Sequence, residues 1–269
     1  MKRIQILTVI LLACAMVAHA DQRSTLDGKY AASLTIETHA TAREQIAYAR
    51  SILSEMAATP PGWQRVTLAT KARIALEVVP QRWPSDIRSV GVAYVLAART
   101  LADENLLPQA VSVCDAAEKA LGEDASAAIA KAVKGTALMR LNRGAEADEA
   151  FSAATRGAAF ARLNDIEKLD VLNRAAQYYE FAKEYGRASQ LIREAARYSQ
   201  SPVHRAGMLL RSLDANERGG DAKEANADAK AIESALREAH ARTLSSGEMV
   251  ALKAFEESLE RHNRERITR

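Results

Sequence analysis

The stretch AIAKAVKGTALMRLNRGAEADEAFSAATRGAAFA, from Ala128 to Ala161, decides the fold of this chain. Its first half places apolar residues on one stripe of a helix, with lysine and arginine on the other side. Turn-forming residues at 142–144 interrupt this pattern. Apolar side chains then return with the spacing of a second helix, at Ala147, Ala150, Phe151 and Ala154. The stretch therefore predicts two short helices folded against each other.

A glycine lies in the middle of the first predicted helix, at Gly135. Glycine at such a position costs roughly 1 kcal/mol relative to alanine. Because it has no side chain, it allows a partner helix to cross closely, toward the lower end of the ~8–10 Å range of interaxial distances. We therefore expect the two helices to make a close contact at Gly135.

The central stretch resembles the tetratricopeptide repeat family. The resemblance rests on small and large side chains at the family's offsets, namely Gly135, Leu138, Ala147, Phe151 and Ala154. Counted from Ala147, equivalent alanines occur at intervals of 37, 41 and 37 residues, at Ala110, Ala188 and Ala225. These intervals are longer than the family's ~34-residue repeat. The resemblance covers about residues 85–240 and implies a binding role for a concave surface.

The whole pattern predicts an all-α fold: a right-handed superhelical stack of about five helical hairpins, closed by a C-terminal capping helix. A capping box at Thr41-x-x-Glu44 begins the first helix, and another at Ser245-x-x-Glu248 begins the last. The helix that starts near residue 164 is expected to bury Tyr179 and Phe181. The helical domain is predicted over residues 41–269, after a loosely structured leader over 21–40.

Residues 1–20, MKRIQILTVILLACAMVAHA, have the three parts of a secretory signal peptide. A short basic end precedes an apolar run, and a small-x-small cleavage site follows it. We expect cleavage after Ala20 and export to the periplasm or beyond. An alternative uses Leu11-Leu12-Ala13-Cys14, which resembles a lipoprotein signal and would anchor the chain through a lipid on Cys14. The apolar run is shorter than the ~20 residues of a membrane-spanning helix, so no integral span is predicted.

The charge of the exported chain is nearly balanced. Cleavage removes Lys2 and Arg3 and no acidic residue, which leaves 35 basic side chains of the original 37 against 34 acidic ones, a net charge of +1. This balance argues against a general nucleic-acid binder and against a polybasic membrane patch. Cys114 is the single cysteine after residue 20, and we expect it to be a buried small residue.

The sequence has no motif of nucleophilic catalysis, phosphate binding or metal binding. The histidines of the exported chain are separated from one another, at His39, His204, His240 and His262. Carboxylate pairs such as Glu180 and Glu184 are typical of any solvated helix. We therefore predict no catalytic residue, no metal site and no cofactor.

The resemblance implies that the inner helix of each hairpin faces the partner. Transferring the family's groove positions onto this sequence gives the candidate partner-binding residues Arg99, Met139, Arg140, Asn173, Gln177, Arg211 and Asp214. The arginines have the guanidinium geometry that binds acidic groups in pairs of hydrogen bonds.

Three hypotheses about function remain open at this point. The first is an exported helical-repeat adaptor that binds a protein or peptide of the cell envelope through its concave face. The second is a lipid-anchored structural component of an envelope assembly. The third is an all-α enzyme that acts on an envelope substrate, with a site assembled only in three dimensions.

Overall fold

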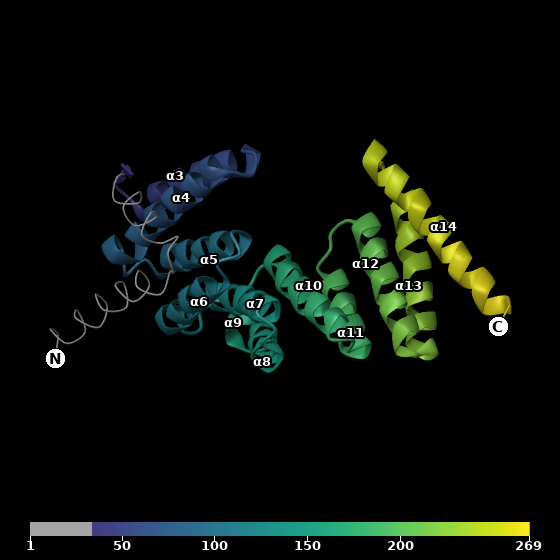
Figure 1. Cartoon of the computed structure of the whole chain (residues 1–269). Coiled ribbons are helices and arrows are strands. Elements are labelled where there is room, and N and C mark those ends of the chain that lie inside the picture. The colour runs from purple at the N-terminus through teal and green to yellow at the C-terminus, as the bar shows by residue number, and fades with distance from the viewer. Residues whose placement is uncertain (1–33, 269) are drawn as a thin grey trace. The chain divides into compact units, whose positions relative to one another are not determined.

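The computed structural model describes residues 34–268, which form twelve α-helices and no β-strand (Figure 1). Ten of these helices pair into five hairpins, so the predicted all-α class and hairpin number are confirmed for the described part of the chain. The helices group into two compact units, and the boundary along the chain lies between Gly122 and Glu123. The signal peptide, Cys14 and the leader before residue 34 lie outside the described residues.

The first unit contains two hairpins. In chain order its helices are α3 (Ala42–Ala58), α4 (Trp63–Arg82), α5 (Ile87–Asp103) and α6 (Leu107–Leu121). The capping box predicted before α3 is present, because the Thr41 hydroxyl accepts from the Glu44 N–H and the Glu44 carboxylate accepts from the Thr41 N–H. Cys114 of α6 is fully buried, as predicted.

A buried glutamine holds the chain that leads into this unit. The Gln45 side chain of α3 accepts from the His39 N–H at 3.0 Å and donates to the Ala75 carbonyl of α4 at 3.1 Å. Residues 34–39 have no regular secondary structure. This end of the predicted leader is therefore fastened to the first hairpin by side-chain hydrogen bonds.

The second unit contains three hairpins and a final helix. Its helices are α7 (Ala125–Arg140), α8 (Gly144–Ala154), α9 (Ala158–Ala161), α10 (Asp165–Phe181), α11 (Tyr185–Arg197), α12 (Pro202–Gly219), α13 (Ala222–His240) and α14 (Ser246–Thr268). Consecutive helices from α10 to α13 pack against each other, and α14 packs on α12 and α13, as a capping helix should. The short helix α9 was not predicted.

Four hairpins share the same turn between their two helices. The turn residue has a positive φ between 58° and 75° in every case, at Asn105, Asn142, Lys183 and Gly220. The next N–H in each turn donates back to a carbonyl five residues earlier, at 2.8–2.9 Å. This is the Schellman pattern, which satisfies carbonyls at a helix end. The reference alanine follows the turn residue by five positions in each hairpin and is at most 4 % exposed.

The close contact expected at Gly135 is present. A Cβ atom on Gly135 of α7 would lie 2.8 Å from a ring carbon of Phe151 in α8. The same aromatic ring stacks on Tyr178 of α10, with 5.2 Å between the ring centroids. Phe151 therefore fills the space left by the missing side chain and also links two successive hairpins.

The prediction that Phe181 is buried is wrong, because its side chain is 70 % exposed at the end of α10. Tyr179 is buried, and on a helix two positions apart correspond to a rotation of about 200°, so these residues face opposite ways.

Candidate partner-binding face

Side chains from α10 and α12 meet on one side of the second unit. We call this surface the α10–α12 face and define it by the residues Asn173, Gln177, Glu180, Phe181, Arg211 and Asp214. On α10, Asn173, Gln177 and Glu180 lie at i, i+4 and i+7, which places them on one side of the helix. Four of the residues transferred from the tetratricopeptide pattern therefore fall within this one surface.

The guanidinium of Arg211 is fixed by α10. Its Nε and Nη2 atoms donate to the two carboxylate oxygens of Glu180 at 2.7 Å and 2.6 Å, and its Nη1 donates to Asn173 Oδ1 at 3.3 Å. Both charged side chains are about 30 % exposed. A bidentate pair at the edge of solvent holds both side chains in one orientation. The Nε edge of Arg211 is thus occupied, and Nη1 faces the amide of Asn173.

The two remaining predicted residues of this face are exposed. Gln177 lies between Asn173 and Glu180 on α10 and faces solvent. Asp214 of α12 pairs with Arg218 one turn further along the same helix, with a 3.0 Å separation. Exposed ion pairs contribute little to stability, so breaking the pair with Arg218 would cost Asp214 little when it binds another group.

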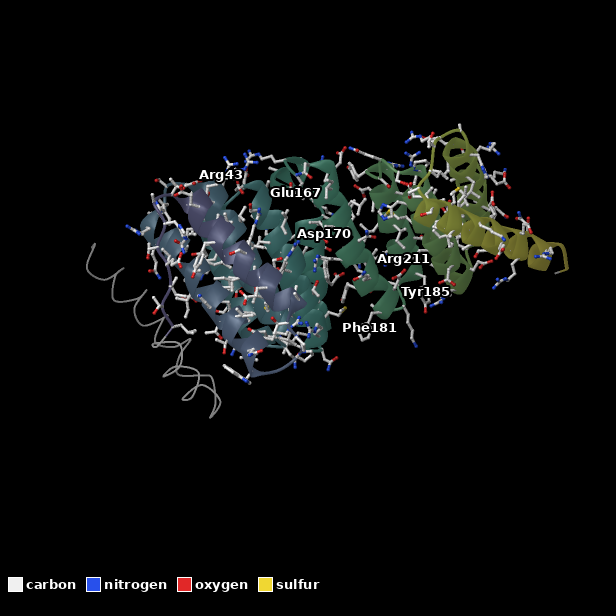
Figure 2. The ribbon with its side chains drawn as sticks, turned by 90° about the horizontal axis from the view of Figure 1, so that it is seen from above. Arg43, Glu167, Asp170, Phe181, Tyr185 and Arg211 are labelled. Carbon is white, nitrogen blue, oxygen red and sulfur yellow. The ribbon has the colours of Figure 1, made fainter. Side chains whose placement is uncertain are left out.

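Phe181 adds a large apolar side chain beside these polar groups. Figure 2 labels Phe181 at the end of α10 and Arg211 on α12. Aromatic side chains and arginine are the residue types that contribute most to binding energy at protein interfaces. Phe181 is therefore the part of the face with the most apolar area to bury on a partner.

A network of polar contacts holds α10 against the neighbouring helices. Tyr179 Oη donates to Asp148 of α8 at 2.7 Å and accepts from Arg187 of α11 at 2.6 Å. The guanidinium of Arg187 also lies 3.9 Å from the Tyr179 ring centroid. Burial raises the pKa of Tyr179, which keeps the phenol neutral and able to donate. The helix that presents the face is thereby fixed from its opposite side.

The other candidate residues lie elsewhere. Met139 and Arg140 are at the end of α7, where Met139 is half-buried and Arg140 is exposed. Arg99 is half-buried on α5, in the first unit. The structure thus gathers Asn173, Gln177, Arg211 and Asp214 on one face but does not place Arg99 in the same unit.

Two members of the face were missed by sequence reasoning. Glu180 was taken as one of a pair of solvated carboxylates, yet it binds Arg211, which lies 31 residues later. No local pattern indicates such a pair. The exposure of Phe181 could have been predicted from the sequence, because a residue two positions from a buried Tyr179 lies outside the buried stripe of the helix.

Within residues 34–268 no three His, Cys, Asp or Glu side chains are grouped as a metal site requires. Two of the histidines pair with glutamates at the surface of α14. His240 of α13 contacts Glu256 at 2.6 Å, and His262 of α14 contacts Glu217 of α12 at 2.6 Å. No helix of the described chain is both long and apolar enough to cross a membrane.

No family model and no curated protein matches the sequence. Among solved structures, the chain is similar to BtubC (BKLC) from P. vanneervenii, with a TM-score of 0.51 and 17 % identity over 77 % of this chain and 95 % of that one. It is also similar to a MamA RS-1 ArsTM double mutant, with a TM-score of 0.46 and 14 % identity over 74 % and 98 % of the two chains. A further MamA structure is similar with a TM-score of 0.47 and 15 % identity, over 75 % of this chain and 97 % of that one.

BtubC has a tetratricopeptide-like helical-repeat fold. The similarity to it shows that this chain has a tetratricopeptide-like fold, and it shows the fold alone.

Proposed function

We propose that this chain is a helical-repeat scaffold that binds a protein or peptide partner through the α10–α12 face. The observation that carries the proposal is the combination of an oriented Arg211 with an exposed Phe181 on the first helices of two successive hairpins. Helical-repeat folds use extended surfaces of this kind for binding.

The pairing of Arg211 with Glu180 supports this role through pre-organisation. A side chain already held in one orientation loses less conformational entropy when a partner binds. A partner that offers an acceptor to Nη1 of Arg211 and an apolar group to Phe181 would leave the Glu180 pair intact. The partner chemistry that fits best is therefore a segment with an apolar residue close to a carboxylate or carbonyl acceptor.

Substitutions on the face test this proposal. Phe181→Ala and Gln177→Glu change exposed side chains, so we expect the melting temperature to stay within about 1 °C of the wild-type value. Recovery of the natural partner from cell-envelope extract, measured by quantitative mass spectrometry, should fall at least several-fold for both variants. Lys230→Gln of α13, also at an exposed position, is the matched control. Equal recovery by Phe181→Ala and the control would exclude the face.

Export belongs to the same proposal. The basic end, apolar run and Ala18-His19-Ala20 site support cleavage after Ala20 and a partner in the periplasm or cell envelope. Mass spectrometry of the mature N-terminus tests this directly, because a free Asp21 indicates soluble export. An acylated Cys14 would instead indicate the lipid-anchored structural component of an envelope assembly.

A further inference from the structure

The first hairpin, α3 and α4, ends in a tip that differs from those of the other four hairpins. The other four share the positive-φ turn and have a charged residue at or next to it, namely Glu104, Arg143, Lys183 and Asp221. In the first hairpin the nine residues from Met56 to Gln64, MAATPPGWQ, include no charged side chain. We call residues 57–66 the first-hairpin tip.

The apolar side chains of this tip face solvent. Trp63 at the start of α4 is 68 % exposed, and Val66, one turn later on the same helix face, is 47 % exposed. The small apolar residues before them are exposed as well, at Ala57, Ala58, Pro60 and Pro61. A group of exposed apolar side chains of this kind marks a surface that binds a protein or a membrane.

A guanidinium group is held beside these apolar side chains. Arg65 Nη1 donates to the Thr59 carbonyl at 3.3 Å, across the turn between the two helices. Arg65 makes no other hydrogen bond and no ion pair with the residues that the structure describes, so four of its five N–H groups have no partner there. Guanidinium groups bind phosphate oxygens through pairs of hydrogen bonds. Arg65 can therefore bind an anionic group next to the apolar surface.

The charge around the tip is positive. Between Glu44 and Arg73 the chain has one acidic residue and three basic ones, namely Glu55 with Arg50, Arg65 and Lys71. The nearly balanced charge of the whole chain does not show this local excess. Apolar side chains next to cations are complementary to the surface of an anionic bilayer, because acyl chains and phosphates lie close together there.

The tip has few groups that could fix the orientation of a protein partner. Apart from Arg65, its exposed polar side chains are the indole N–H of Trp63 and the amide of Gln64. Protein interfaces usually combine apolar area with many directional hydrogen bonds. A bilayer surface requires no fixed geometry, and tryptophan is enriched at membrane–water interfaces because one end of its ring is apolar and the other polar. The composition of the tip thus favours a lipid surface.

We propose that the first-hairpin tip binds the surface of an anionic phospholipid bilayer. The side chains of Trp63 and Val66 enter the boundary between headgroups and acyl chains, and the Arg65 guanidinium binds a lipid phosphate. The tip belongs to the first unit and the α10–α12 face to the second, so this inference does not depend on the proposed protein partner.

Tryptophan fluorescence tests the contact. The chain has two tryptophans, so Trp83→Phe leaves Trp63 as the single emitter. The chain from Asp21 onward is used, because the apolar run before it would itself bind lipid. Vesicles with equal parts of phosphatidylglycerol and phosphatidylcholine should shift the Trp63 emission saturably to shorter wavelength. Binding to phosphatidylcholine vesicles should be at least about tenfold weaker, because each cation near an anionic surface contributes about 1 kcal/mol.

Three variants assign the contact by cosedimentation with the anionic vesicles. Trp63→Ala should weaken binding at least about tenfold, and Arg65→Gln about fivefold, which corresponds to about 1 kcal/mol for one cation. Val66→Glu places a carboxylate against the anionic surface and should abolish binding. Because Trp63 and Val66 are exposed, their variants should fold like wild type. Ile166→Ala on α10, where the wild-type side chain is 78 % exposed, is the matched control and should bind normally.

Absence of a Trp63 spectral shift with the anionic vesicles would overturn the proposal. Equal affinity for the two kinds of vesicle, or equal loss of binding by Ile166→Ala and Trp63→Ala, would also overturn it. A chain that does not sediment with vesicles, but forms a discrete protein adduct from a photoreactive amino acid at position 64, would assign the tip to a protein partner instead.

Discussion

Gly135 of α7 and Phe151 of α8 lie so close that a Cβ atom on Gly135 would be 2.8 Å from the aromatic ring. Phe151 is 1 % exposed, so its ring has little space to move aside. This contact sets how closely the two helices of the central hairpin approach.

Replacing Gly135 with alanine tests that contact. Alanine improves helix propensity by roughly 1 kcal/mol, but overpacking of a filled core costs typically about 1–3 kcal/mol. We therefore expect Gly135→Ala to lower the free energy of unfolding by up to about 2 kcal/mol in urea denaturation. Gly186→Ala in α11, where a Cβ meets nothing within 4 Å, is the control and should not destabilise. A stabilised Gly135→Ala variant would contradict the packing described above.

Lys183 occupies the positive-φ position of the turn between α10 and α11, with φ of 61°. A residue with a Cβ atom pays about 1 kcal/mol for this conformation, whereas glycine adopts it freely. We expect Lys183→Gly to raise the free energy of unfolding by several tenths to about 1 kcal/mol. The same change at Lys230, inside α13, should lower it by about 1 kcal/mol. A destabilised Lys183→Gly variant would show that the turn has another geometry.

Asp228 should make stability depend on pH in a defined direction. Its pKa in the folded chain is raised above the ordinary value of 3.8, so the folded state holds this proton more tightly than the unfolded state does. The contribution of Asp228 to stability is therefore lost as pH rises through and above 3.8. Asp228→Asn removes this titration, so its free energy of unfolding should rise relative to the wild-type value as the pH is raised from 3.8 to 7. A difference, variant minus wild type, that instead rises on acidification would reverse the assignment.

Phe255 fastens the final helix to the last hairpin. A Cβ atom on Gly207 of α12 would lie 2.8 Å from the Phe255 ring, and Leu252 and Leu259 of the same helix are buried. We expect Phe255→Ala to cost about 1–3 kcal/mol and to release α14 locally, because few other apolar contacts hold it. Limited trypsin digestion should then cleave after Arg242 faster than in the wild type. Met249→Ala, at a position that is 54 % exposed, should leave the rate unchanged.

The fold was predictable because its signals are local and repeated. The alanines at Ala110, Ala147, Ala188 and Ala225 are buried in four hairpins, and each follows the same Schellman turn. Helix caps at Thr41 and Ser245 depend on residues three positions apart, so they can be found in the sequence alone. The positive-φ turn at Lys183 was not predicted, because lysine carries no preference for that conformation.

The candidate sites were less predictable because they depend on contacts between distant residues. The bond between Arg211 and Glu180 joins different hairpins, and a helical pattern does not report it. The polar cluster that Ser212 and Asn216 form around Asp228 also joins two helices, although the change from apolar to polar side chains at its repeat positions was visible in the sequence. A polar residue at a position that is apolar in the other repeats therefore indicates a buried polar cluster, which the helical period alone does not show.

Site-specific photocrosslinking tests the central claim most directly. A photoreactive amino acid replaces exposed Gln177 on the α10–α12 face, or exposed Glu233 on α13 as the control, in cells that express the full chain. If the α10–α12 face binds the partner, we expect a discrete protein adduct at position 177 and none at position 233. Adding Phe181→Ala should then abolish the adduct at position 177. Adducts of equal yield at both positions, or none at position 177, would contradict the account.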